Sequence, residues 1–191
     1  ADPEAALVAL NRMRVLCAVR EGPFGVHTLN GRIEQALEQA GLIRRTGEVY
    51  AGRPVMVTSN DHAQRLYNGD LGLILPDADA GGALRVFFET AEGSRRILPS
   101  RLPPHETVYA MTVHKSQGSE FDRVILVLPR AESRVLTREL IYTGITRGKK
   151  LVVIVGQAKA VAIAVKNVSG RRRWTKLREW LAGNTATAGT V

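Results

Sequence analysis

The sequence predicts an α/β protein with a parallel sheet, interrupted by a small antiparallel β-barrel. Two short runs rich in valine and isoleucine, residues 124–128 and 151–155, are typical of buried strands. Between them Thr137 is a candidate helix N-cap, and Leu140 and Ile141 fall on one helical face. Strands that alternate with helices in this way favour a parallel sheet.

The remaining elements follow from residue spacing and turn signals. Residues 4–12 are expected to form a helix with Leu7 and Leu10 on one face, and residues 29–40 an amphipathic helix that ends at Gly41. Further strands are expected at residues 14–19 and 54–58, followed by three short strands at residues 71–75, 84–89 and 95–98. Glycine and aspartate turns separate these three short strands, which favours a small barrel.

These patterns divide the chain into three parts. We expect an α/β domain over residues 1–65 and 106–168, an inserted barrel over residues 66–105, and a basic, partly disordered tail over residues 169–191. In the tail, Arg171, Arg172, Arg173 and Trp174 could bind nucleic acid through charge and one stacking ring, or could be a solvated basic segment.

One segment, residues 107–129, carries most of the chemical information. In it a polar loop that contains glycine joins two apolar strands, and ligands of open α/β folds bind at such loops. The loop is either a site for phosphate or nucleic acid, or a solvated connection. Its polar or glycine positions are Thr112, His114, Lys115, Ser116, Gln117, Gly118 and Glu120.

Composition narrows the class of protein further. The chain has 191 residues, and its 27 Lys and Arg outnumber 18 Asp and Glu, giving a net charge of +9 that favours phosphate-bearing partners. Cys17 is the single cysteine, so no disulfide forms within the chain, which fits a reducing, cytoplasmic location. We expect no membrane span and no metal site, because His114 lacks partners at ligand spacing.

Four segments carry a resemblance to a known family. Residues 111–122, MTVHKSQGSEFD, resemble motif V of superfamily-1 helicases, and residues 139–150, ELIYTGITRGKK, resemble motif VI. Residues 15–30 resemble motif IV of the RecD branch, and residues 52–72 resemble the RecD segment before its inserted barrel. The resemblance covers roughly residues 7 to 165 and implies the second RecA-like domain of a 5′-to-3′ DNA helicase, with an SH3-like barrel inserted.

The resemblance also implies roles on the nucleotide side. Arg147 matches the arginine finger of motif VI, and Arg20 is the best match to a motif IV arginine that reaches the γ-phosphate, although it could be an ordinary arginine at a strand end. Gln117, Gly118 and Glu120 would lie near the nucleotide, although Glu120 could instead make a structural hydrogen bond within the loop.

On the DNA side the resemblance implies phosphate contacts by Thr112 and His114, and Lys115 can join them without reading sequence. His114 could instead only brace the loop. Asn60 could contact a DNA strand, whereas Asn68 and Gly69 read as a tight turn.

No GxxxxGK[ST] motif occurs in the sequence, so we expect ATP and Mg²⁺ to be bound mainly by a preceding RecA-like domain. This chain alone would then lack ATPase activity. Implied partners are single-stranded DNA, that N-terminal RecA-like domain, and RecB- and RecC-type subunits of exodeoxyribonuclease V. Alternatives are a non-catalytic module that binds single-stranded DNA or docks on subunits, and a domain of a stand-alone RecD-like or relaxase-type helicase.

Overall fold

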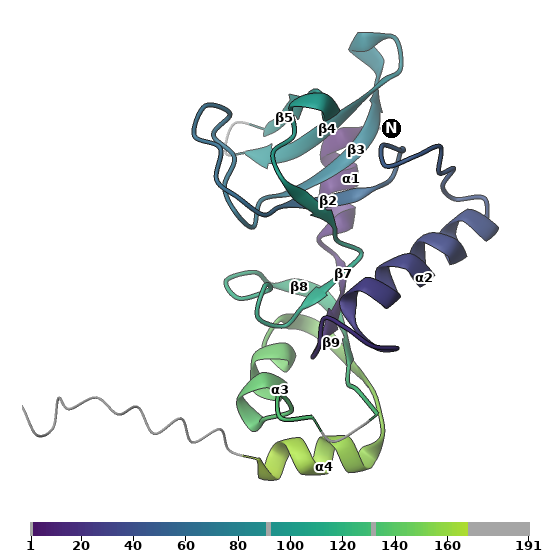
Figure 1. Cartoon of the computed structure of the whole chain (residues 1–191). Helices are drawn as coiled ribbons and strands as arrows, with labels where there is room; N and C mark the ends of the chain where they lie inside the picture. The colour runs from purple at the N-terminus through teal and green to yellow at the C-terminus, as the bar shows by residue number, and fades with distance from the viewer. Residues whose placement is uncertain (1, 91–92, 131–132, 168–191) are drawn as a thin grey trace, which may run out of the picture.

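A computed structural model describes residues 2–90, 93–130 and 133–167. It contains a four-stranded sheet in the order β7-β1-β8-β9 and a five-stranded sheet in the order β5-β4-β3-β2-β6. In Figure 1 the five-stranded sheet forms the upper part of the molecule and the four-stranded sheet the lower part, with helix α2 projecting to one side. The chain passes between the two parts at both ends of the five-stranded sheet.

The four-stranded sheet is parallel throughout, as predicted. It consists of β1 (Met13–Cys17), β7 (Ala110–Thr112), β8 (Phe121–Val127) and β9 (Gly148–Val155). Strand β1 lies between β7 and β8, with Cys17 opposite both Thr112 and Val127. This arrangement confirms the expected α/β class.

Helices cover both faces of the parallel sheet. Helix α2 (Val26–Gln39) packs on the face that carries Cys17, while α3 (Arg138–Ile145) and α4 (Ala158–Lys166) pack on the face that carries Leu16. Adjacent strand residues point to opposite faces, which explains the division. Thr137 caps α3 as predicted, because its Oγ1 accepts a 3.2 Å hydrogen bond from the amide of Leu140.

Strand β9 corrects one expectation. Residues 151–155 were expected to be buried, yet Leu151 is 51%, Val153 44% and Val155 43% exposed. The strand lies at the edge of the sheet, and the residues of α2 pack over β7 and β1 rather than over β9. A run of valine and isoleucine therefore predicts the strand correctly but does not reveal whether another layer covers it.

The five-stranded sheet is antiparallel. Its strands are β2 (Pro54–Val57), β3 (Leu71–Asp77), β4 (Ala83–Thr90), β5 (Gly93–Ile97) and β6 (His105–Thr107). Two short 3₁₀ turns, Ala78–Ala80 and Pro99–Arg101, lie between strands. The sheet begins at Pro54 and ends at Thr107, so it extends beyond the predicted insertion of residues 66–105 at both ends.

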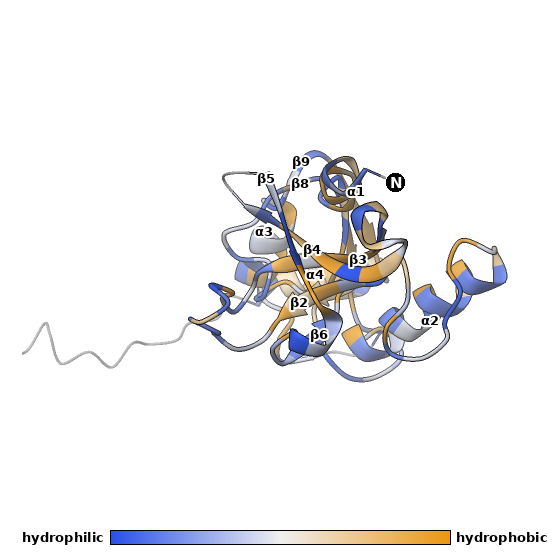
Figure 2. Cartoon of the chain, turned by 90° about the horizontal axis from the view of Figure 1, so that it is seen from above, coloured by the Kyte–Doolittle hydropathy of each residue, from blue (hydrophilic) through white to orange (hydrophobic). Residues whose placement is uncertain are grey.

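The predicted SH3-like barrel is not observed as a closed ring of strands. Within the described residues the order β5-β4-β3-β2-β6 is open, with β5 and β6 as its two edges. One face buries Val55, Ile74 and Val86 in a common cluster. Viewed from above, the strands β2, β3 and β4 carry most of the apolar colouring, whereas α2 is largely hydrophilic (Figure 2).

Helix α1 (Pro3–Leu10) packs against this antiparallel sheet. Leu7 is 3% exposed and shares a cluster with Leu73, Leu75 and Phe87. The predicted helix and its buried Leu7 are thus confirmed. The helix contacts the five-stranded sheet although its residues fall in the segment 1–65 that was predicted to belong to the α/β domain.

A buried arginine of β1 contacts three separate segments of the chain. Arg14 is 1% exposed, and its guanidinium donates hydrogen bonds to the carbonyl oxygens of Val108 (2.8 Å) and Leu10 (3.3 Å). The same group lies over the ring of Phe121, 5.1 Å from its centroid. Burial lowers the pKa of Arg14 to about 10. One side chain thereby connects α1, the β6–β7 connection and the start of β8.

Candidate functional site

The loop between β7 and β8, residues 113–120, is a compact turn built by its own side chains. Ser116 is 0% exposed, and its hydroxyl donates a 2.7 Å hydrogen bond to the carbonyl oxygen of Val113. Thr112 Oγ1 accepts a 3.3 Å bond from the amide of Lys115, and Gly118 has a φ of +87°. The sequence assigned no role to Ser116, whose burial makes it the internal brace of this loop.

Arg147 links the end of α3 to this loop. Its guanidinium donates hydrogen bonds to the carbonyl oxygen of Thr143 (3.1 Å), the carbonyl oxygen of Ser119 (3.0 Å) and Oγ1 of Thr146 (3.2 Å). The backbone oxygen of Arg147 accepts a 2.8 Å bond from the amide of Phe121. Two segments that lie far apart in sequence, the ones resembling motifs V and VI, are thus in direct contact.

Glu120 lies in the same neighbourhood. Its carboxylate forms a 3.2 Å ion pair with Lys149, and both side chains are more than half exposed. This ion pair with Lys149 offsets part of the negative charge of Glu120.

His114 and Gln117 open onto a separate hollow. Both line a pocket of about 490 Å³ together with Thr143 and Glu139 of α3. The side chains of His114 and Gln117 are exposed, and the amide of Gln117 donates a 3.3 Å bond to the carbonyl oxygen of His114. The pocket is thus formed jointly by the loop and the helix that Arg147 connects.

Arg20 and Lys115 share one carboxylate. Glu106 of β6 lies 2.5 Å from Lys115 Nζ through Oε1 and 3.8 Å from Arg20 Nη2 through Oε2. Arg20 is 56% exposed and follows the carboxyl end of β1 by three residues. Arg147 instead precedes the amino end of β9, so the two arginines stem from opposite ends of a parallel sheet.

Asn60 takes part in a turn rather than in this cluster. Its Oδ1 accepts a 2.8 Å hydrogen bond from the amide of Asn68, which lies in the β2–β3 connection next to Gly69, whose φ is +101°. In the described part of the chain, no hydrogen bond or ion pair joins Asn60 to Thr112, His114 or Lys115. The observed contact of Asn60 is therefore one within the β2–β3 connection.

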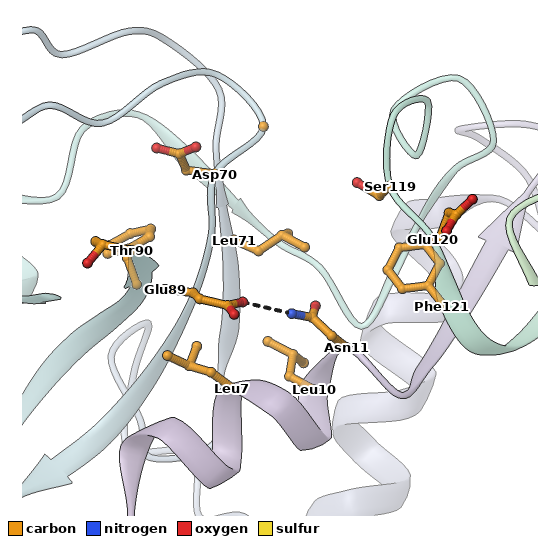
Figure 3. A pocket seen from close by; sticks show the side chains of 12 residues that line it. Leu7, Leu10, Asn11, Asp70, Leu71, Glu89, Thr90, Ser119, Glu120 and Phe121 are labelled. Carbon is orange, nitrogen blue, oxygen red and sulfur yellow. Dashed lines mark hydrogen bonds between the residues drawn. The ribbon is translucent and has the colours of Figure 1, made fainter. Parts of the chain in front are cut away.

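A larger pocket, of about 600 Å³, lies where the loop meets the antiparallel sheet. Ser119, Glu120 and Phe121 form one side of it, and residues of α1, β3 and β4 form the other (Figure 3). The Asn11 amide donates a 3.3 Å bond to Glu89 across α1 and β4. The segment that contacts Arg147 therefore also faces the antiparallel sheet.

Residues 2–90, 93–130 and 133–167 contain no group of three or more His, Cys, Asp or Glu side chains placed to hold a metal ion. Over the same ranges no helix is both long and apolar enough to cross a membrane. The predicted tail site Arg171–Trp174 lies outside the described residues.

Comparison with known proteins identifies the class of this domain. Residues 107–155 match the family of UvrD-like helicase C-terminal domains. This match spans the loop, α3 and β9, including Arg147. The chain therefore carries a helicase C-terminal domain.

The domain is of the RecD type. It is 41% identical over 180 residues to the RecBCD enzyme subunit RecD of Mycobacterium tuberculosis, covering 92% of this chain and 30% of that protein. It is 41% identical over 171 residues to RecD of Haemophilus influenzae, covering 88% of this chain and 25% of that protein. It is 33% identical over 154 residues to the ATP-dependent RecD2 DNA helicase of Deinococcus radiodurans, covering 80% of this chain and 21% of that protein.

The chain thus spans less than a third of the length of the curated relatives named above. Among solved structures, a Pif1 helicase from Bacteroides in complex with ADP-AlF3 and ssDNA aligns with a TM-score of 0.48 and 17% identity. That alignment covers 93% of this chain and 46% of the Pif1 chain.

Proposed function

We propose that this chain is the C-terminal motor domain of an ATP-dependent 5′-to-3′ DNA helicase that acts in double-strand break repair as part of exodeoxyribonuclease V. The observation that carries the proposal is the contact between Arg147 and the Ser119 carbonyl, which joins the motif VI helix to the motif V loop. The identity with RecD proteins over nearly all of the chain supports it.

In this proposal Arg147 is the arginine finger. A nucleoside triphosphate with Mg²⁺ supplies the free energy of phosphoryl transfer, and both are bound mainly by a P-loop domain whose motif this sequence lacks. Arg147 is half-buried and its partners are two carbonyls and a hydroxyl, with no carboxylate among them. Because no carboxylate is among these partners, none competes with an anionic ligand for the guanidinium.

The hydrogen bond from Arg147 to Ser119 couples nucleotide binding to the loop that contacts DNA. When Arg147 turns toward an anion across the domain cleft, its Nη1 leaves the Ser119 carbonyl, and the loop loses a tether. His114 lies in this loop and Thr112 directly precedes it. Their position on single-stranded DNA therefore shifts with the state of Arg147. Gln117, Gly118 and Glu120 occupy the nucleotide-facing end together with Arg147, whereas Arg20 lies at the opposite end of the parallel sheet and pairs with Glu106.

The partners follow from this role. They are single-stranded DNA, an N-terminal RecA-like domain, and RecB- and RecC-type subunits, in the cytoplasm. The isolated chain is then inactive as an ATPase. A second candidate function, a non-catalytic module that binds single-stranded DNA or docks on subunits, is favoured by the net charge of +9 and the exposed His114. A further alternative is a domain of a stand-alone RecD-like helicase, which the similarity to the RecD2 DNA helicase favours, or of a relaxase-type helicase.

The test is DNA-stimulated ATP hydrolysis by the intact RecD-type protein that contains this domain. Arg147→Ala is expected to lower turnover by roughly 10³-fold while changing the KM for ATP far less. Arg147→Lys should restore only a small part of the rate, because an ammonium cannot make the fork-like contacts of a guanidinium.

Arg138→Ala is the matched control, since Arg138 is the exposed first residue of the same helix. It should leave turnover within about twofold of the parent, as expected for a surface substitution. Normal turnover of the Arg147→Ala protein would refute the motor proposal and leave the binding-module alternative.

A further inference from the structure

Glu106 stands at a point where three segments of the chain meet. Its carboxylate contacts Lys115 from the loop after β7 and Arg20 from the loop after β1, while Glu106 itself belongs to β6. The side chains of Glu106 and Lys115 are 25% and 29% exposed. The cluster is therefore reachable from solvent, yet organised by one acidic residue.

The arrangement has the features of an occupied anion site. Two cations from different segments face the two oxygens of a single carboxylate, and the main-chain amide of Lys115 is fixed by Thr112 Oγ1. An ammonium and a guanidinium bind phosphate oxygens with the same charge-assisted hydrogen bonds. Partly exposed ion pairs contribute little to stability, so a phosphate group can displace the carboxylate.

We propose that Lys115 and Arg20 form a phosphate-binding site that Glu106 occupies as an internal competing anion. The inference rests on the proposed function for its ligand, a phosphate oxyanion of either single-stranded DNA or a nucleotide. It adds Glu106, to which the sequence assigned no role, as the residue that sets the affinity of this site.

The position of Glu106 gives the site a second property. Strand β6 pairs with β2, with Glu106 opposite Met56, so the competing carboxylate is part of the antiparallel sheet. Ligand binding at Lys115 and Arg20 breaks the contacts that this carboxylate makes with both loops. Phosphate binding therefore removes one set of contacts between the antiparallel sheet and these loops, which links the sheet to ligand occupancy.

The experiment measures binding of a fluorescent oligo-dT to the full chain carrying Glu106→Gln. Binding of ATP is measured separately, on the intact RecD-type protein that contains this domain with the same substitution. Glutamine keeps the shape but removes the charge, so affinity for the phosphate-bearing ligand is expected to rise about fivefold. The log-log salt slope of oligo-dT binding should also become steeper by up to about one unit. A gain for oligo-dT assigns the site to the DNA backbone, and a gain for ATP assigns it to the nucleotide.

Two controls separate competition from a structural role. Asp79→Asn removes an equal charge from an exposed ion pair with Arg96 on the antiparallel sheet, and should leave both affinities unchanged. The double variant Glu106→Gln/Lys115→Ala should lose the gain. If Glu106 only braces the loop, Glu106→Gln will leave binding unchanged or weaken it for both ligands, and that result overturns the inference. This outcome is independent of ATP turnover in the Arg147 variants.

Discussion

Nη1 of Arg147 donates a 3.0 Å hydrogen bond to the carbonyl oxygen of Ser119, a residue 28 positions earlier in the chain. The amide of Phe121 returns a 2.8 Å bond to the carbonyl oxygen of Arg147. The end of α3 and the loop before β8 are therefore held together from both sides. The guanidinium thus contacts directly the loop that carries His114.

The exposed imidazole of His114 should contribute to DNA binding. His114→Ala is expected to weaken the binding of single-stranded DNA by roughly fivefold, equally for different sequences, because the proposed contact is to phosphate. Fluorescence anisotropy with oligo-dT and a mixed-sequence oligonucleotide measures this. His27→Ala serves as the control, since His27 is an exposed residue of α2 that pairs with Glu21 from the preceding turn. Equal affinities for the parent and the His114→Ala chain would argue against DNA-side placement of the loop.

Gly118 should tolerate substitution poorly for reasons of backbone conformation. Its φ of +87° disfavours any residue with a Cβ, although no atom lies within 4 Å of the position that a Cβ would take. Gly118→Ala is expected to lower the free energy of unfolding by about 1 kcal/mol. Gly31→Ala, in the middle of α2 with equal free space, should instead raise it by about 0.5–1 kcal/mol. Urea denaturation of both variants compares the two, and a stabilised Gly118→Ala protein would contradict the observed turn.

Cys17 should report on unfolding through its thiol. It is fully buried, and burial raises the pKa of the thiol to about 12 from an ordinary value of 9. A thiol reagent at pH 8 is therefore expected to modify Cys17 only when the chain unfolds. Rapid stoichiometric labelling of the native chain at pH 8 would show that the β1 core is open.

The raised pKa of the Cys17 thiol also predicts a pH dependence of stability. The folded chain holds the thiol proton more tightly than the unfolded chain, so the stabilisation is complete below about pH 9 and is lost as pH rises toward 12. The slope from this group reaches at most about 1.4 kcal/mol per pH unit. The free energy of unfolding of the parent and of Cys17→Ala is compared by denaturation at pH 8 and pH 10.5. The comparison isolates the contribution of the thiol, since the alanine variant lacks it.

The sequence predicts local structure well where local signals decide it. Thr137 marks the start of α3 because an N-cap needs only its own helix, and Leu7 marks the buried face of α1 through helical spacing. Helix α2 begins at Val26, three residues before the predicted start at 29, because the preceding turn ends at Gly25. A Cβ at Gly25 would lie 2.5 Å from the carbonyl oxygen of Arg20, a clash that no local pattern reveals.

Contacts between distant residues escape such patterns. Arg14 falls in a strand where the sequence gives no reason for burial, yet its partner Val108 lies 94 residues away. Glu106 gains its role only because β6 brings it to Lys115 and Arg20. The exposure of β9 likewise depends on which helices cover the sheet, and α4 was not predicted at all.

The most direct test of the account is the affinity of the intact RecD-type protein for a transition-state analogue, ADP with fluoroaluminate, in the presence of single-stranded DNA. An arginine finger stabilises the transferring phosphoryl group rather than the diphosphate. Arg147→Ala should therefore weaken binding of the analogue by about 100-fold or more and leave binding of ADP alone within about twofold. Equal affinities of the parent and the Arg147→Ala protein for the analogue would contradict the role proposed for Arg147.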